Sequence, residues 1–203
     1  MNTNFCFDDH FLWKEFGENK KNLVKTPNIF CNILLSYYDK LKNLKDINLA
    51  LETGTYEAHS AMCMSKLFSK VSTVELYAEQ NPYNNKNLLE LYKNIKKEYN
   101  NIDFYFGESP KFLKEIISQN LNETFFILLD AHTFNYSPML DELDAIKNNS
   151  NKNDHIIMID DCNFLGYNGY PTYDILQKCI LNINSEYKIT NTFQGNGILL
   201  IHI

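Results

Sequence analysis

Short apolar segments alternate with longer amphipathic segments along most of this chain. The short segments are rich in Ile, Val, Leu and Phe, whereas the long ones carry apolar residues at helical spacing. This alternation constrains the fold more than any other feature, because it is typical of βαβ units that build a parallel sheet covered by helices. The predicted strands are Ile47–Leu51, Val71–Glu75, Ile102–Phe106, Phe125–Leu129 and His155–Ile159.

The C-terminal part has a different pattern. Two strand-like runs, Tyr187–Phe193 and Ile198–Ile203, are separated by the turn Gln194–Gly197, which predicts a tight antiparallel hairpin. The predicted helices cover residues 26–43, 58–68, 85–99, 109–119, 138–148 and 171–181. We therefore predict an α/β fold with a Rossmann-like, doubly wound, mostly parallel seven-stranded sheet that ends in an antiparallel β-hairpin.

The length of 203 residues suits a single domain. We expect residues 1–45 to form an N-terminal helical cover and residues 46–203 to form the Rossmann-like core. Hydrophobic residues make up 44% of the chain, which is enough to build a full core and argues against global disorder.

Charge and cysteine content limit the classes of partner. The net charge is −6 and the sequence contains no arginine, which argues against a nucleic-acid partner, although an AT-rich genome also depletes arginine. The five cysteines are scattered, which favours free thiols in a reducing compartment. There is no signal-peptide pattern and no apolar run near the ~20 residues of a spanning helix, so we expect a cytoplasmic protein without a membrane partner.

Acidic residues stand at or just beyond the end of every predicted parallel strand. They are Glu52, Glu75, Glu108, Asp130 and the pair Asp160-Asp161. Ligands of open α/β sheets bind beyond the carboxyl ends of the strands, where the strand order reverses. The sequence therefore predicts one cleft lined by these carboxylates.

The turn after the first strand indicates which ligand this cleft takes. It contains a single glycine, Gly54, whereas a dinucleotide fingerprint needs three glycines for the backbone to approach a pyrophosphate. Glu52, just before the glycine, would repel phosphate and attract an ammonium group. S-adenosylmethionine carries an ammonium group and a sulfonium but no phosphate, so we expect its methionine end over Glu52, Gly54, Thr55, Tyr56 and Ser60. A simple tight turn is the alternative for Gly54.

Two further acids fit an adenosine. Glu75 lies about 20 residues beyond Gly54, where a carboxylate can accept both ribose hydroxyls. Glu108, with Ser109 beside it, is placed to accept the adenine amino hydrogen. The alternatives are a solvated or helix-capping acid for Glu75 and an ordinary helix cap for Glu108.

The order of these residues resembles the class I S-adenosylmethionine-dependent methyltransferases over roughly residues 45–203. The segments that carry the resemblance are Glu52-x-Gly54, Glu75, Gly107-Glu108-Ser109, Asp130, Asp160-Asp161 and the terminal hairpin. The resemblance implies the strand order 3-2-1-4-5-7-6 with an antiparallel seventh strand. It also implies that the glycine-rich turn, the ribose acid and the adenine-side acid fall on Gly54, Glu75 and Glu108. Ala58 departs from the family, since many members have a glycine there.

Two segments are similar to the metal-dependent sugar and catechol O-methyltransferases. They are Leu129-Asp130-Ala131-His132 with Pro138 and Glu142-Leu143, and Ile159-Asp160-Asp161 with Tyr170-Pro171. The resemblance implies that Asp130, Asp160 and Asp161 hold a magnesium ion. Converging carboxylates repel one another unless they share a proton or a cation. The alternative is that Asp130 contacts the cofactor and that the acidic pair caps the next loop.

His132 is a candidate general base, because its ordinary pKa suits removal of the acceptor proton. With Asp130 it forms the expected catalytic pair, and a substrate hydrogen bond or a structural role is the alternative. The aromatic N-terminal segment and the loop Cys162–Tyr170 could form a lid or acceptor wall, or simply cover the core.

The predicted function is methyl transfer from S-adenosylmethionine to a hydroxyl of a sugar or hydroxylated small molecule, with magnesium assistance as an option and a homodimer as a compatible assembly. Three alternatives stay open: a metal-independent methyltransferase, a non-catalytic Rossmann-like binding protein and a nicotinamide-dependent oxidoreductase.

Overall fold

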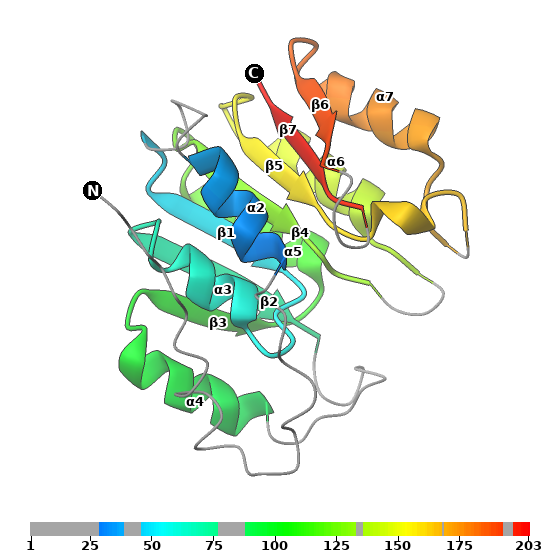
Figure 1. Cartoon of the computed structure of the whole chain (residues 1–203). Coiled ribbons are helices and arrows are strands. Elements are labelled where there is room, and N and C mark those ends of the chain that lie inside the picture. The colour runs from blue at the N-terminus through cyan, green and yellow to red at the C-terminus, as the bar shows by residue number, and fades with distance from the viewer. Residues whose placement is uncertain (1–28, 39–45, 77–87, 133–135, 168, 193–196) are drawn as a thin grey trace.

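The chain builds one seven-stranded sheet in the order β3-β2-β1-β4-β5-β7-β6 (Figure 1). The computed structural model describes residues 29–38, 46–76, 88–132, 136–167, 169–192 and 197–203. The strands are β1 Leu49–Thr53, β2 Lys70–Glu75, β3 Ile102–Phe106, β4 Phe125–Leu129, β5 Ile156–Ile159, β6 Lys188–Asn191 and β7 Leu199–His202. Strands β1 to β5 pair in parallel, and β7 pairs antiparallel with both β5 and β6.

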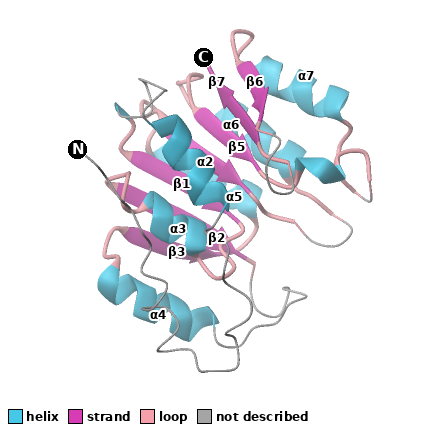
Figure 2. Cartoon of the chain, viewed as in Figure 1, coloured by secondary structure: helices cyan, strands magenta, loops and turns pink. Residues whose placement is uncertain are grey.

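Helices cover both faces of this sheet (Figure 2). They are α2 Ile29–Tyr38, α3 His59–Met64, α4 Leu88–Glu98, α5 Ser109–Gln119, α6 Met139–Asn149 and α7 Tyr173–Ile183, with a short 3-10 helix, η3 Cys162–Phe164. Side chains of α2, α3 and α4 share one buried cluster with one face of the strands. Side chains of α5, α6 and α7 share a second cluster with the opposite face. The apolar strands are therefore covered on both sides, as the pattern of their residues requires.

The carboxyl ends of the central strands lie level with one another. Thr53, the last residue of β1, pairs with Val74 of β2 and with Leu129 of β4. The strand order reverses between β1 and β4, so the residues just after these strands surround the switch point.

The predicted fold class and strand order are confirmed. Strands β3 and β4 have the predicted bounds, and β2 starts one residue early. Strand β1 lies two residues later than predicted, so Glu52 belongs to the strand and not to the turn. The hairpin is present, and residues 193–196 of its connection lie outside the described residues.

Most of the predicted N-terminal cover also lies outside the described residues, including the expected helix start at Thr26-Pro27. Helix α2, which belongs to that segment, buries Phe30, Ile33 and Leu34 in the first cluster. The single-domain organisation stays a prediction. Among the described helices, none is both long and apolar enough to cross a membrane.

Candidate functional site

A cleft of about 860 Å³ opens at the carboxyl ends of β1, β2, β3 and β4. Of the residues predicted to bind a cofactor, six line this cleft: Gly54, Tyr56, Glu75, Glu108, Ser109 and Asp130. His132 lines it as well. The volume is in the range that encloses a cofactor-sized ligand. Three of the strand-end acids, Glu75, Glu108 and Asp130, meet at this cleft, whereas Glu52, Asp160 and Asp161 are not among the residues that line it.

Gly54 brings the first turn against the backbone that follows β4. Its φ of +83° is a left-handed conformation that favours glycine. A Cβ at this position would overlap the carbonyl oxygen of Asp130 and lie 2.8 Å from the carbonyl carbon. The Gly54 N–H donates to the carbonyl oxygen of Val74 at 2.9 Å. Glycine is therefore required here by close approach, as well as by the turn.

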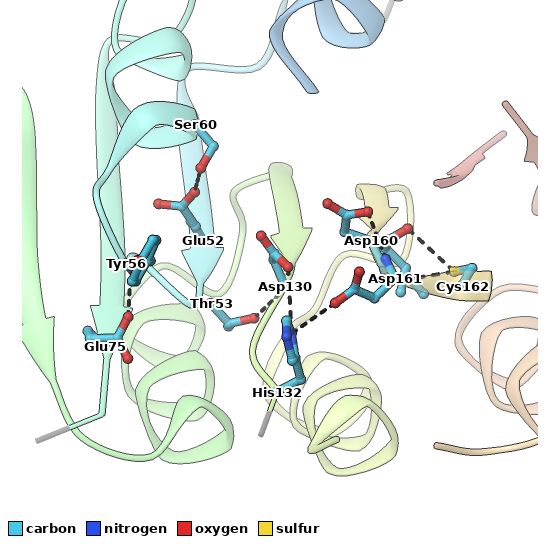
Figure 3. A network of polar contacts seen from close by, with 11 residues as sticks. Glu52, Thr53, Tyr56, Ser60, Glu75, Asp130, His132, Asp160, Asp161 and Cys162 are labelled. Atoms are coloured by element: carbon cyan, nitrogen blue, oxygen red, sulfur yellow. Dashed lines mark hydrogen bonds and ion pairs between the residues drawn. The ribbon is translucent and has the colours of Figure 1, made fainter. Parts of the chain in front are cut away.

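Glu75 at the end of β2 organises the same turn (Figure 3). Its Oε2 accepts the backbone N–H of Tyr56 at 2.7 Å, and its Oε1 accepts the N–H of Leu76 at 2.9 Å. Burial raises the pKa of Glu75, and the two backbone donors partly offset this rise. The Tyr92 hydroxyl from α4 donates to the carbonyl oxygen of Tyr56 at 2.7 Å, which fixes the other side of the turn.

Glu52 lies away from the lining of the cleft, contrary to its predicted place beside the methionine end. Because β1 extends to Thr53, the alternation of side chains along the strand buries Glu52 completely, beneath α3. Its carboxyl accepts hydrogen bonds from the Ser60 hydroxyl and from Thr73 Oγ1, the latter at 2.6 Å. Burial raises the pKa of Glu52 to about 7, which exceeds the opposite effect of these two hydroxyls.

Thr55 and Ser60 are likewise absent from the residues that line the cleft. The Thr55 hydroxyl is buried and lies 2.6 Å from Thr73 Oγ1. Ser60 and Thr55 thus join Glu52 in a polar network behind the turn. This network supports the cofactor-sized cleft without facing it.

Glu108 is at the N-cap position of α5, but its side chain makes no capping hydrogen bond. It lines the cleft and forms an exposed ion pair with Lys111 at 2.7 Å. Ser109 beside it is buried. The capping role considered for Glu108 therefore has no support, and its carboxylate remains available as part of the wall of the cleft.

An imidazole and several carboxylates meet beside the cleft, beyond β4 and β5 (Figure 3). His132 Nδ1 lies 3.1 Å from Asp161 Oδ2 and 3.9 Å from Asp130 Oδ1. One ligand atom from each of these three residues lies within 4.8 Å of the others. Desolvation, followed by the carboxylates of Asp160 and Asp161, raises the pKa of Asp130 well above its usual range. Such a cluster can hold a cation or a shared proton.

Asp160 is held differently from its neighbour. Its Oδ1 accepts the backbone N–H of Asp161 at 2.7 Å, and burial raises its pKa. Asp161 has a left-handed φ of +59°, and Figure 3 shows the two carboxylates pointing in different directions. Of the predicted metal ligands, the structure thus groups Asp130 and Asp161, together with His132, while Asp160 points elsewhere.

Glu142 is a buried acid to which the sequence pattern assigned no role. It lies on α6, is only 1% exposed, and lines a cavity of about 10 Å³ with Asp130, His132, Asp160 and Asp161. Burial raises its pKa to about 7, although the Ser109 and Thr53 hydroxyls lower it. Its spacing of three residues from Met139 and four from Ile146, both buried, is a signal that could have placed it on the inner face of the helix.

The loop after β5 brings aromatic rings to the His132 side of the cleft. The Tyr170 ring lies 6.4 Å from the His132 ring, and the Phe164 ring lies 5.8 Å from Tyr170. Phe164 is 46% exposed. These contacts place part of the predicted acceptor wall next to the cluster of acids.

Comparison with solved structures decides what this fold is. A methyltransferase from Podospora anserina bound to S-adenosylhomocysteine superposes with a TM-score of 0.53, at 14% identity over 84% of this chain and 75% of that one. The fold is that of the class I S-adenosylmethionine-dependent methyltransferases. No family model matches the sequence, and no curated protein is similar to it.

The methyltransferase fold is shared with proteins whose names indicate different acceptors. The precorrin-6y C5,15-methyltransferase from Geobacter metallireducens has a TM-score of 0.52 and 18% identity, covering 93% of each chain. A candidate caffeoyl-CoA O-methyltransferase from Staphylococcus aureus has a TM-score of 0.52 and 14% identity, covering 85% of this chain and 91% of that one. These similarities establish the methyltransferase fold. The acceptor has to be inferred from the residues of the site in this chain.

Proposed function

We propose that this chain binds S-adenosylmethionine in the large cleft and transfers the methyl group to a hydroxyl oxygen of a small acceptor. One observation carries the proposal: a methyltransferase fold presents, at its switch point, a cofactor-sized cleft with a buried carboxylate, Glu75, beside a one-glycine turn. The turn lacks the glycines that a pyrophosphate needs, and Glu75 suits a ribose.

The cofactor residues are assigned by their positions in the cleft. Gly54 and Tyr56 contact the methionine end, Glu75 accepts the ribose hydroxyls, and Glu108 with Ser109 faces the adenine. Asp130 also lines the cleft, and we assign it a place between the cofactor and the acceptor. The buried network of Glu52, Thr55 and Ser60 supports the turn from behind, and we now assign these residues a positioning role.

The reaction is an in-line displacement. The acceptor oxygen attacks the methyl carbon, the carbon–sulfur bond breaks with its electron pair going to sulfur, and the acceptor hydroxyl loses its proton. Holding donor and acceptor collinear supplies most of the rate. When no cation is bound, Asp130 and His132 are the groups in the cleft that can receive this proton.

The acids beside the cleft also suit a divalent cation. Asp130 and Asp161 fit the ligand set by position and spacing, and Asp160 would have to turn to join them. A bound cation would make the acceptor hydroxyl more acidic and fix its oxygen next to the methyl group. The acceptor class we propose is a sugar or another hydroxylated small molecule, with Tyr170 and Phe164 forming one wall.

Titration calorimetry of the purified protein tests the cofactor. S-adenosylmethionine should bind, whereas NAD should give no heat of binding. Glu75→Ala should lower the affinity for S-adenosylmethionine by about 100-fold, because the two proposed hydrogen bonds from the ribose hydroxyls to this carboxylate are lost. Glu115→Ala, an exposed acid on α5, is the matched control and should leave affinity unchanged. Absence of heat with S-adenosylmethionine would refute the proposal.

Product analysis distinguishes an enzyme from a binding protein. With a panel of sugars and phenols, S-adenosylmethionine should be converted to S-adenosylhomocysteine in the presence of the correct acceptor. A chelator should abolish turnover if a cation is required, and should leave it unchanged in a metal-independent methyltransferase.

A further inference from the structure

The cluster beside the cleft contains a nitrogen donor. His132 Nδ1 lies 3.1 Å from one carboxylate oxygen of Asp161 and 3.9 Å from one of Asp130. Ligand atoms about 2.0–2.2 Å from a first-row metal ion lie roughly 3–4 Å from one another. The three ligand atoms, none of which lies more than 4.8 Å from another, are therefore close enough together for one ion to reach all three.

Asp160 does not complete this set. Its Oδ1 accepts the N–H of Asp161 at 2.7 Å, and Figure 3 shows its carboxylate directed away from His132. Among the described residues, the group with metal-ligand spacing consists of Asp130, His132 and Asp161. The donor set is therefore two oxygens and one imidazole nitrogen, and not oxygens alone.

Glu142 provides an independent indication that this cluster holds a ligand. Its side chain is 1% exposed, and although the Ser109 and Thr53 hydroxyls bond its carboxyl, its Oε1 has no hydrogen-bond partner among the residues that the structure describes. It lines the cavity of about 10 Å³ that Asp130, His132, Asp160 and Asp161 also line, which is about the size that one water fills. Buried carboxylate oxygens are normally paired, so this oxygen lacks a donor. A water bound to a cation in the cluster would supply one.

We propose that Asp130, His132 and Asp161 bind one divalent transition-metal ion in preference to Mg²⁺, and that Glu142 accepts a hydrogen bond from a water on that ion. Imidazole ligands favour first-row transition metals, whereas Mg²⁺ prefers oxygen ligands and rigid octahedral geometry. Mutation of a residue that hydrogen-bonds a metal-bound group lowers the affinity of the protein for the metal ion. The role of Glu142 can therefore be measured. In the loaded protein His132 is a ligand and not the general base.

The inference rests on the proposed function only for the use of the ion, because ion binding can be measured without cofactor or acceptor. Metal-stripped protein is titrated with Mn²⁺, whose free form is followed by electron paramagnetic resonance, and then with Mg²⁺ as competitor. Co²⁺ gives a second signal, since its visible absorption reports the coordination geometry and should differ between wild type and His132→Gln. Wild type should bind Mn²⁺ at least tenfold more tightly than Mg²⁺.

Two variants separate the parts of the site. His132→Gln, which replaces the imidazole by an amide, should lower the affinity for Mn²⁺ at least tenfold while changing the affinity for Mg²⁺ less than threefold. Glu142→Gln should weaken Mn²⁺ about tenfold. Asp144→Asn, an exposed acid on the same helix, is the control and should bind like wild type. Thermal unfolding of each variant confirms that it is folded.

The outcomes are decisive in each direction. Equal affinity for Mn²⁺ and Mg²⁺, or unchanged Mn²⁺ binding by His132→Gln, would overturn the metal assignment. Unchanged Mn²⁺ binding by Glu142→Gln would overturn the role of that residue. If Mn²⁺ binds as expected while S-adenosylmethionine does not bind, the proposed function fails and the metal site stands.

Discussion

Gly54 and Gly166 adopt nearly the same left-handed backbone, with φ of +83° and +85°, in different surroundings. In this left-handed conformation an alanine at either position would destabilise the folded chain by about 1–2 kcal/mol. At Gly54 the new Cβ would also collide with the Asp130 carbonyl, whereas at Gly166 no atom lies within 4 Å. Gly54→Ala should therefore lower the free energy of unfolding by about 3 kcal/mol, and Gly166→Ala by about 1 kcal/mol.

Urea unfolding measures both glycine variants, and calorimetry measures their cofactor affinity. The difference between the two variants isolates the collision from the backbone strain. Equal losses of stability would mean that close approach at Gly54 contributes nothing.

The buried carboxyl of Glu52 makes stability depend on pH. Its pKa is about 7 in the folded chain, against 4.5 for an ordinary glutamate. The unfolded chain therefore loses this proton first as the pH rises, so the contribution of Glu52 is complete below about pH 4.5 and is lost as the pH rises through 7. Its size is on the order of 3 kcal/mol.

Glu52→Gln removes this titration. The stability of the wild type relative to Glu52→Gln should fall between about pH 5 and pH 8, as measured by urea unfolding at several pH values. A difference that stays constant over this range would show that Glu52 is already ionised in the folded protein.

At the scale of the elements, His155 connects strands β4 and β5. Its Nδ1 accepts the backbone N–H of Phe125 at 3.1 Å, and its Nε2 lies 3.1 Å from Ser150 Oγ. Burial lowers its pKa to about 4, from an ordinary value of 6.5. Because the unfolded chain takes up the proton first, His155 favours unfolding progressively as the pH falls from about 6.5 to 4.

The chain should therefore lose up to about 3 kcal/mol of stability through His155 in this pH range. His155→Gln should remove that part of the acid sensitivity, while His202→Gln on β7 should leave it in place. Chemical unfolding at pH 7 and pH 5 gives the comparison. An unchanged pH dependence in His155→Gln would contradict the assignment.

The sequence predicts the elements well because their apolar patterns are strong. Strand β4 is five consecutive apolar residues, and its bounds follow directly. Strand β1 ends in Glu52-Thr53, which resembles the start of a turn in composition, so the sequence predicts its end two residues too early. Glu142 lies on the inner face of α6, where a carboxyl is exceptional, and an acid on a helix is ordinarily expected to face solvent.

The sequence predicts which residues come near the cleft, but it does not predict the directions of their side chains. The residues that follow each strand, such as Glu75 and Asp130, reach the cleft because the strand ends are level. The directions of Asp160 and Asp161 depend on the left-handed backbone at Asp161, which the sequence does not reveal. The contact of His132 Nδ1 with Asp161 Oδ2 is therefore not predicted from the sequence.

For the molecule as a whole, a ligand that binds the folded state must raise the unfolding temperature. S-adenosylmethionine at about 100 times its Kd should stabilise the chain by about 2.7 kcal/mol, which corresponds to a rise of roughly 5–10 °C for a protein of this size. Thermal denaturation should show this shift in wild type and not in Glu75→Ala. An equal shift with NAD would instead favour a nicotinamide-dependent oxidoreductase.

The position of β7 has a consequence for synthesis. It follows β6 in the chain but is inserted between β5 and β6, so β6 has no neighbour in the sheet when it leaves the ribosome. The parallel strands can assemble first, while β5 keeps an unpaired border open to other nascent chains. A chain whose translation stalls before residue 199 would therefore expose the unpaired edge of β5 and be prone to aggregate.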